Sequence, residues 1–412
     1  MPSALGSRYW RLWSATTVSN LSDGIYQVVL PLVAVAYTRS PVLVAAVSIA
    51  SYLPWLLFAL HAGALADRYD RRRLMLWMSL LRMGALAGFG AAVLLGIDGL
   101  ILLYGLALAM GVAEVLFDTS AQSILPMLVG RDQLGVANAR LYAAQELTNG
   151  FAGSAVGGVL VGVAVAVAFF VPAALCGLAV VGLLLLRGTY QTPHPGGSTL
   201  REDILEGVRY LRGNRLLRTL AAMVAGMNLA STAFWSVFVL YAVGPQSPMQ
   251  LTTAQFGLLM ASLAAGAVFG SLIAARLQRW VGRARLLTAT VLSSALLLVV
   301  PVFTTHPAAV AAGFFLFSAG VMGWNIVTVS LRQRVVPERL LGRVNACYRL
   351  LAWGSMPIGA GLGGVLGELV GLRGVFVFAA GLSLLLLVGR LIITDAAMDA
   401  AELDGDRLAA LP

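Results

Sequence analysis

Long apolar stretches recur along most of the chain, separated by short polar segments. A bilayer span needs about 20 mainly apolar residues, and the stretches reach or approach that length. The pattern therefore predicts an all-α membrane protein with about twelve transmembrane helices. We expect these spans near residues 12–37, 42–66, 74–96, 99–125, 138–164, 166–187, 216–243, 254–277, 285–304, 307–331, 340–368 and 373–394.

Composition supports this class of protein and argues against ATP hydrolysis by the chain itself as its energy source. The chain is 59% hydrophobic and 11% charged. Its 28 basic residues are all arginines, so a Walker A phosphate loop and a pyridoxal-phosphate Schiff base, which both need lysine, are excluded. The protein must therefore draw its work from a source other than its own ATP hydrolysis.

The net charge of +10 is distributed in a way that favours a membrane protein over a nucleic-acid binder. Arginines gather at the two termini and after every second span, whereas only Arg39 and Arg373 fall on the opposite side and Arg82 and Arg349 lie inside spans. This asymmetry predicts that both termini and the arginine-rich loops are cytoplasmic. We expect no nucleic-acid partner.

An internal repeat divides the spans into two halves. Sequence pieces recur in the same order at an offset of about 207 residues, for example Ala137-Asn-Ala139 as Val344-Asn-Ala346. Two parallel halves related about the membrane normal are an architecture of transporters. We expect an N-terminal half over 1–187, a linker over 188–215, a C-terminal half over 216–394 and a cytoplasmic tail over 395–412.

The linker and the tail carry their own patterns. Thr199 and Glu202 form a capping-box pattern that opens an amphipathic helix in the linker. This helix either lies on the cytoplasmic leaflet or packs under the bundle as a tether. The acidic tail from Asp395 onwards is expected to be a solvated, mobile end.

Residues for catalysis or metal binding are scattered. Cys176 and Cys347 lie inside predicted spans and favour small buried hydrophobic groups over a disulfide or a metal site. The three histidines form neither a catalytic triad nor a zinc motif. We therefore expect no enzyme activity, no metal and no cofactor.

The loop after the second span carries a family motif. Gly63-Ala-Leu-Ala-Asp67-Arg68-Tyr-Asp-Arg71-Arg-Arg73 resembles the signature loop of the major facilitator superfamily. The segment Gly150-Phe-Ala-Gly-Ser154-Ala-Val-Gly-Gly158 is similar to the antiporter motif of that superfamily, with Ser154 in place of its proline. With Asn20, Asp23 and Gly24 in the first span, the chain looks most like the branch of macrolide and siderophore exporters.

The resemblance implies a conformational latch at the signature loop. We expect Gly63, Asp67, Arg68 and Arg71 to belong to it, with Asp67 accepting bonds from a helix start on the cytoplasmic side. The alternative for the arginines is purely topological, because they keep the loop inside.

Glycines of the fifth and eleventh spans permit close helix approach, either for packing alone or for a surface that slides during transport. These helix-packing glycines are Gly153, Gly157, Gly158, Gly359, Gly363 and Gly364.

Polar side chains inside the spans are the functional candidates. Asn20, Asp23 and Gln27 follow helical spacing on one face of the first span. Asp23 lies roughly 20 Å along the helix from Trp10, which places it near mid-membrane. A carboxylate there must be paired, hydrated or protonated, so Asp23 either couples transport to protons or makes a structural hydrogen bond.

Further candidates lie on other spans. Glu114 and Glu146 are the other proton-coupling candidates. Arg82 or Arg349 either neutralises one of these two acids or extends its side chain to the membrane interface. Asp118 is expected nearer the inner interface as a cap or gate contact. Aromatic residues such as Trp235, Trp324 and Trp353 either line a substrate wall or anchor the protein in lipid. The cavity-lining candidates are Asn20, Gln27, Asp118, Asn149, Asn228, Thr232, Asn325 and Arg349.

These observations predict a secondary active transporter of a bacterial inner membrane. We expect it to act as a monomer and to export a small amphipathic drug-like, macrolide-like or siderophore-like molecule in exchange for protons by alternating access. Uptake or facilitated passage through the same fold is the alternative. A membrane enzyme or a non-transporting receptor would need a catalytic cluster or a signalling domain, and the sequence shows neither.

Overall fold

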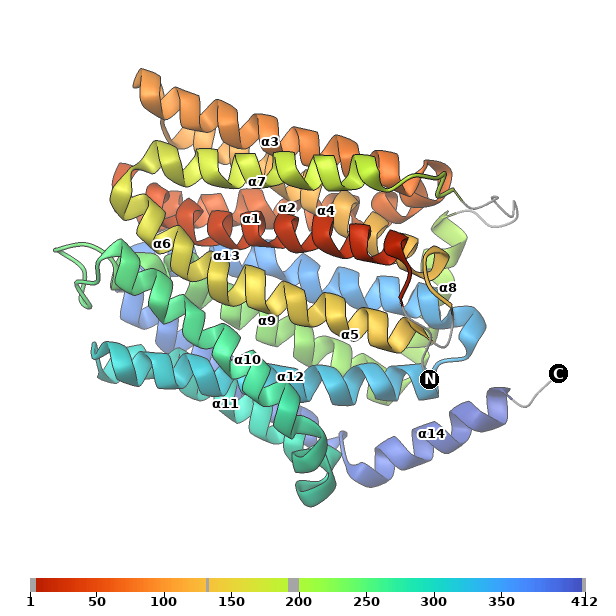
Figure 1. Cartoon of the computed structure of the whole chain (residues 1–412). Helices are drawn as coiled ribbons and strands as arrows, with labels where there is room; N and C mark the ends of the chain where they lie inside the picture. The colour runs from red at the N-terminus through yellow and green to blue at the C-terminus, as the bar shows by residue number, and fades with distance from the viewer. Residues whose placement is uncertain (1–4, 131–132, 192–199, 410–412) are drawn as a thin grey trace. The chain divides into compact units, whose positions relative to one another are not determined.

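The computed structural model describes residues 5–130, 133–191 and 200–409, and nearly all of them are helical (Figure 1). Within these ranges no strand forms, and one isolated bridge joins Val243 to Leu251. The helices are α1 Ser7–Tyr37, α2 Pro41–Arg68, α3 Arg71–Leu95, α4 Leu100–Ile124, α5 Leu134–Gln145, η3 Glu146–Gly153, α6 Ser154–Val163, α7 Val165–Leu185, α8 Leu200–Gly213, α9 Arg215–Ala242, α10 Thr253–Val281, α11 Arg283–Phe303, α12 Pro307–Val335, α13 Glu338–Leu385, η4 Leu386–Leu391 and α14 Asp395–Ala409.

The prediction of about twelve spans is confirmed. In the described part of the chain, 10 helical stretches are long and apolar enough to cross a membrane. One of them, Leu340–Leu391, contains a break at Gly371, where a φ of 78° ends one span and starts the next. The consecutive helices α5, η3 and α6 supply the remaining span, which is divided by a π-helical segment.

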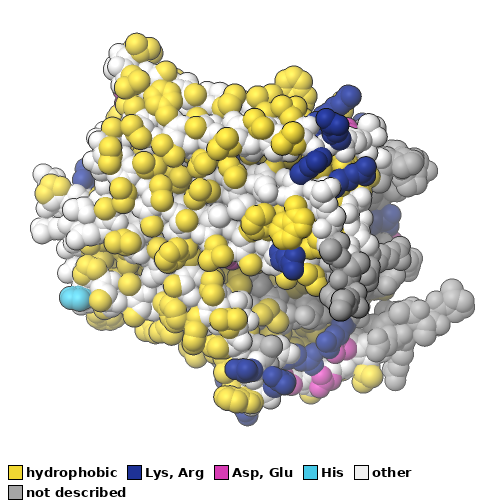
Figure 2. All heavy atoms as spheres, viewed as in Figure 1, with side chains coloured by type: hydrophobic (Ala, Val, Ile, Leu, Met, Phe, Trp, Pro, Cys, Tyr) yellow, Lys and Arg dark blue, Asp and Glu magenta, His cyan; other side chains and the backbone are white. Residues whose placement is uncertain are grey.

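The chain forms two compact units. The N-terminal unit contains Met1–Pro195 together with Val239–Ala264, and the C-terminal unit contains Gly196–Phe238 together with Ala265–Pro412. Apolar side chains cover much of the face shown in Figure 2, as expected for a protein surrounded by lipid.

In the N-terminal unit, Arg11 of α1 and Arg72 of α3 lie beside the C-terminal end of α7. α7 packs between α1 and α3, and α4 packs on α2 and α3. A core of Tyr9, Leu12, Met75, Phe117 and Ile124 joins these helices at that end. Helix limits follow local chemistry: the Asp70 carboxylate accepts a bond from the Arg73 amide at the start of α3.

In the C-terminal unit, the linker helix α8 packs against α13. The Tyr210 hydroxyl donates to the Val335 carbonyl at 2.9 Å, and Glu206 forms an ion pair with Arg343. Leu211 is buried in the core formed by α9, α11, α12 and α13. Of the two alternatives for this helix, the structure therefore favours the one in which it packs under the bundle.

The acidic tail is an ordered helix, so its prediction as a solvated, mobile end is wrong. Arg283 at the start of α11 pairs with Glu402 at 2.5 Å and also with Asp399, and Met398 is fully buried. The Asp395 carboxylate accepts the Ala284 amide at 3.0 Å. Composition alone suggested a free acidic end, but these acids meet the cationic start of α11 and an apolar face of α14 faces the core.

Candidate functional site

Asp23 of α1 forms a buried ion pair with Arg82 of α3. The Arg82 Nη1 donates to the Asp23 carboxylate at 3.0 Å and to the Ser19 hydroxyl at 3.1 Å. The Arg82 side chain is 1% exposed and that of Asp23 is 13% exposed. The guanidinium also lies 4.8 Å from the ring centre of Phe117 on α4. Three helices therefore hold one charged pair inside the N-terminal unit.

The direct partner of Arg82 is an acid other than the expected Glu114 or Glu146, although Arg82 also interacts electrostatically with Glu114. Arg82 pairs with Asp23, and because it is almost completely buried it does not extend to the interface. The first span lacks an arginine near Asp23, and the partner comes from the third span instead. Breaking such a buried pair is costly, since each charge has lost its hydration and the partner replaces it.

Two further carboxylates lie near the guanidinium. Glu114 and Asp118, one turn apart on α4, are close enough to Arg82 to interact with it electrostatically. Glu114 also interacts with the Asp23 carboxylate and with the hydroxyls of Tyr26 and Tyr52. Three acids therefore share one guanidinium, and a fully ionised cluster would carry excess negative charge in a dry environment.

The other polar residues on the same face of α1 as Asp23 make no charged contact among the described residues. Asn20 is half-buried and Gln27 is exposed. The Thr16 hydroxyl donates back to the Leu12 carbonyl of its own helix at 3.0 Å. Of the polar residues on this face of α1, Asp23 is thus the one with a charged partner in the described contacts.

A π-helical segment packs directly beside Asp23. It carries Glu146 and Asn149, both half-buried, which brings two more of the predicted residues to the N-terminal unit. A side chain on Gly24 would lie 2.6 Å from the Asn149 Cα, so glycine is required for this approach. π-Bulges are frequent at functional sites. Directly beside Asp23, the backbone of α1 at Gly24 therefore packs closely against the backbone of the π-helical segment at Asn149.

The predicted glycines lie at close helix approaches in each unit. Gly153 and Gly157 face α1, and Gly158 approaches Gly257 of α10 within the N-terminal unit. In the C-terminal unit, Gly359 and Gly363 of α13 face the α9 backbone at Leu229 and Ala233. Gly364 is buried. Equivalent glycines thus bring the fifth span to the first and the eleventh span to the seventh.

In the signature loop, the described arginine contacts stay within the N-terminal unit. The Arg71 Nη1 donates to the Ser123 carbonyl at 3.1 Å at the end of α4, and the Arg72 Nε donates to the Leu183 carbonyl at 2.7 Å at the end of α7. Cations at helix C-termini satisfy free carbonyls and complement the helix dipole.

Of the three other members of the predicted latch, the structure describes the surroundings of Arg68. The Arg68 carbonyl accepts from the Gln191 amide, while its side chain is exposed. The side-chain positions of Gly63 and Asp67 lie outside the described part of the chain, although both residues belong to α2.

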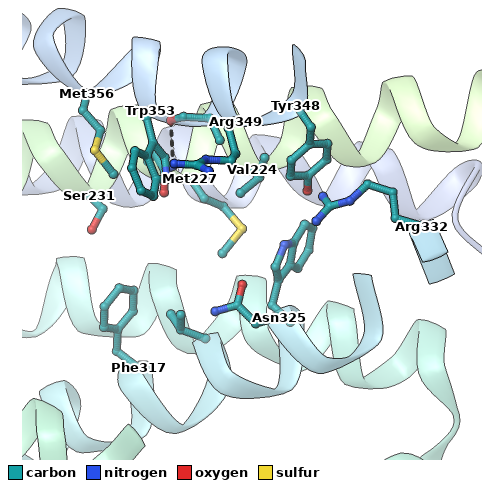
Figure 3. A pocket seen from close by; sticks show the side chains of 14 residues that line it. Val224, Met227, Ser231, Phe317, Asn325, Arg332, Tyr348, Arg349, Trp353 and Met356 are labelled. Carbon is teal, nitrogen blue, oxygen red and sulfur yellow. Dashed lines mark hydrogen bonds between the residues drawn. The ribbon is translucent and has the colours of Figure 1, made fainter. Parts of the chain in front are cut away.

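The C-terminal unit contains a cavity of about 300 Å³ between α9, α12 and α13 (Figure 3). Three of the predicted residues, Asn228, Asn325 and Arg349, line it, whereas Thr232 is buried and is not among its lining residues. The Asn228 amide donates to the Ala352 carbonyl at 2.7 Å, which fixes one wall. The lining residues are Val224, Met227, Asn228, Ser231, Phe317, Val321, Trp324, Asn325, Arg332, Tyr348, Arg349, Ala352, Trp353 and Met356.

The aromatic residues divide between core and cavity. Trp324 and Trp353 line the cavity. Trp235 packs edge-on against Phe314 in an aromatic cluster, and Phe234, Phe238, Phe314 and Phe376 are fully buried there. Tyr348 has no counterpart among the sequence candidates, because a lone tyrosine in an apolar span carries no pattern. A neighbouring arginine on another span, Arg332, is what gives it a polar setting.

Comparisons with known proteins agree with this architecture. Residues 6–409 match the family described as transmembrane secretion effector. The enterobactin exporter EntS of Salmonella typhimurium is 28% identical over 344 residues, covering 80% of this chain and 80% of that protein. The multidrug efflux pump Tap of Mycolicibacterium fortuitum is 27% identical over 398 residues, covering 90% and 92%.

Solved structures share the fold at low identity. The nucleoside transporter NupG superimposes with a TM-score of 0.74 and 11% identity, over 94% of this chain and 98% of that one. A bacterial homologue of the iron transporter ferroportin gives a TM-score of 0.71 and 16% identity, over 99% and 100%. Because the family match spans nearly the whole chain and its helices superimpose on those of solved transporters, this chain belongs to the transmembrane secretion effector family of the major facilitator superfamily.

Proposed function

We propose that the protein exports a small amphipathic molecule in exchange for protons. The observation that carries this proposal is the Asp23–Arg82 pair with Glu114 and Asp118 beside it. The related proteins named as a siderophore exporter and a multidrug pump support outward transport of such a molecule. The absence of lysine leaves no Walker A loop to energise it.

The cluster is suited to bind and release a proton. While Asp23 is ionised, its carboxylate neutralises Arg82. Protonation of Asp23 frees Arg82 to interact with Glu114 or Asp118, which lie on α4. A proton can thus change the contacts between α1, α3 and α4 without leaving a bare charge in the membrane. The groups around Asp23 in this unit also include Cys176 and Tyr26.

In this proposal, protonation is coupled to alternating access of the two halves at a bacterial inner membrane, and the protein works as a monomer. In the same proposal both termini are cytoplasmic, because Arg11 and Arg72 lie together at the end of α7 in the N-terminal unit, and Arg283 and Arg334 lie beside α14 in the C-terminal unit. The latch role of Asp67 and Arg71 belongs to the same proposal. An Asp67→Asn variant should insert and fold but turn over slowly, whereas Arg71→Gln should also loosen the end of α4.

The test uses purified protein in liposomes with an acidic lumen and a panel of hydrophobic drugs and siderophores. Wild-type protein facing inside-out should accumulate a substrate against its gradient. Asp23→Asn imitates the protonated acid, so it should reduce pH-driven accumulation by about tenfold or more while sparing downhill exchange.

Asp98→Asn is the matched control. Asp98 accepts a hydrogen bond from the Tyr37 hydroxyl at the loop between α3 and α4, away from Arg82. This variant should keep gradient-driven transport. Uphill export by Asp23→Asn with an unchanged pH dependence would assign Asp23 a structural role and leave Glu114 or Glu146 as the coupling candidate.

A further inference from the structure

The cavity of the C-terminal unit contains a group of hydrogen-bond donors that lack acceptors. Nε and Nη1 of Arg332 and Nε1 of Trp324 are buried, and none of them has a well-oriented hydrogen-bond acceptor among the described residues. Arg332 and Trp324 lie on α12, two turns apart, and both line the cavity. These nitrogens belong to groups that only donate. The described cavity lining offers these donors no anionic acceptor.

Tyr348 of α13 completes this donor group. Its ring lies 4.0 Å from the Arg332 guanidinium carbon, and Figure 3 shows the two side chains against one another. The Tyr348 hydroxyl is buried and lies close enough to Trp324, Thr328 and Arg332 to interact with them. Among the described residues, however, its contacts with Trp324 and Arg332 fall short of full hydrogen-bond geometry. The aromatic face holds the cation in place without neutralising it.

The remaining walls of the cavity are basic, apolar or, at Asn228, Ser231 and Asn325, polar without charge. None of its 14 described lining residues is an aspartate or a glutamate. Arg349 lies over the Trp353 ring at 4.9 Å, and Phe317 lies across the cavity from this pair (Figure 3). Met227, Met356 and Val224 add apolar surface. Leaving a buried donor without a partner is unfavourable, and a charged donor more so, which favours an occupant that supplies an anionic acceptor.

We propose that this cavity binds the carboxylate-like, negatively charged group of an amphipathic substrate whose ring or chain lies against the aromatic and methionine side chains. The assignment rests on the proposed export function, because it names the class of molecule that is carried. Arg332 lines the cavity, so a rotation about its side-chain bonds brings its donors to the anion. A cavity of about 300 Å³ accommodates one ring system with one acidic group.

Equilibrium binding to the full-length protein in lipid nanodiscs tests the assignment without any proton gradient. The probes are 1-naphthoate, the neutral 1-naphthalenemethanol and the cationic 1-naphthylmethylammonium, which share one ring system and differ in charge. Wild-type protein should bind 1-naphthoate about tenfold or more tightly than the neutral compound, and the cation most weakly.

The variants assign the preference to particular donors. Arg332→Gln should remove the tenfold preference while leaving 1-naphthalenemethanol binding unchanged, and Trp324→Phe, which keeps an aromatic ring, should weaken 1-naphthoate binding several-fold. Arg334→Gln is the matched control, since Arg334 lies on the same helix and pairs with Glu402. It should bind all three probes like the wild type.

Two results would overturn the assignment: equal affinity of the wild type for the anion and the neutral compound, or an unchanged charge preference in Arg332→Gln. Because no gradient is applied, these outcomes are separate from a failure of proton coupling. A protein that prefers 1-naphthoate but shows no pH-driven accumulation would keep the cavity assignment and contradict the proposed coupling.

Discussion

At the scale of residues, Asp23 and Arg82 form a buried, hydrogen-bonded ion pair in the N-terminal unit. Arg82 is almost entirely buried, and its Nε and Nη2 have no hydrogen-bond partner in the described part of the chain. Its buried charge is therefore compensated mainly by Asp23, Ser19 and the face of Phe117. A buried pair adds little net stability over an apolar packing, but removal of one partner leaves a bare charge. The pair is therefore better suited to switching than to stabilisation.

The first prediction at this scale is a double-mutant cycle. Arg82→Gln leaves the Asp23 carboxylate unpaired and should lower stability at pH 8 by about 3–5 kcal/mol, and the second change Asp23→Asn should restore most of that loss. Thermal unfolding in detergent measures each step. Because protonation removes the Asp23 charge, the defect of Arg82→Gln should shrink as the pH falls. Additive effects of the two changes at pH 8 would show that the pair is not coupled.

At the scale of elements, glycine contacts determine how closely α1 approaches the π-helical segment. A methyl group on Gly24 would lie 2.6 Å and 2.7 Å from the Asn149 Cα and carbonyl carbon. These are backbone atoms, so they cannot rotate away as a side chain would. The same type of approach recurs between α9 and α13 in the C-terminal unit. The glycines of the repeated motif are thus explained by helix separation.

Gly24→Ala should therefore separate α1 from the π-helical segment and cost about 1–3 kcal/mol, with reduced transport because Asp23 moves with α1. Gly88→Ala on α3 is the control, since a side chain there meets no atom within 4 Å. Melting temperature and transport rate are both measured. A Gly24→Ala protein as stable and active as Gly88→Ala would contradict this packing.

The C-terminal helix α14 makes a second prediction at this scale. Glu402 is 19% exposed and forms ion pairs with both Arg283 and Arg334. Asp399 is 65% exposed and pairs with Arg283. Glu402→Gln should lower stability by about 1–2 kcal/mol and Asp399→Asn by less than about 0.5 kcal/mol, because exposed pairs contribute little. Chemical unfolding at low and high salt compares the two. Equal effects of both substitutions would show that burial does not determine the strength of this contact.

At the scale of the whole molecule, charge asymmetry predicts how each unit is oriented in the membrane. The arginines of α1 and α3 meet the end of α7 in the N-terminal unit, and Arg283, Arg334 and Arg343 meet acids of α14 and α8 in the C-terminal unit. Each unit therefore has one cationic end. Positively charged ends remain in the cytoplasm.

Cysteine labelling in intact cells tests this orientation. In a background of Cys176→Ala and Cys347→Ala, the exposed positions Tyr69→Cys and Trp280→Cys, one at the cationic end of each unit, should resist an impermeant thiol reagent. His306→Cys, between α11 and α12, should react and serves as the positive control. Ready labelling of Tyr69→Cys or Trp280→Cys would reverse the topology of that unit.

The sequence by itself determined the class of protein, the approximate spans and the repeat. These properties depend on local hydropathy, on charge distribution and on glycine spacing, all of which are visible along one chain. The motif after the second span was enough to indicate the superfamily, which the family match confirms. The residues Asp23, Glu114 and Arg349 were identifiable because charged groups inside spans are rare.

Only the tertiary structure decided which of these residues are partners. Arg82 lies on a different span from Asp23, and nothing along the chain selects Asp23 over Glu114 or Glu146 as the acid that pairs with Arg82. Tyr348 and Arg332 likewise meet because α12 and α13 pack together, and the acids of the tail find Arg283 only when α14 folds back. Pairing depends on helix packing across long sequence separations, and packing is decided by the shapes of surfaces that hydropathy does not encode.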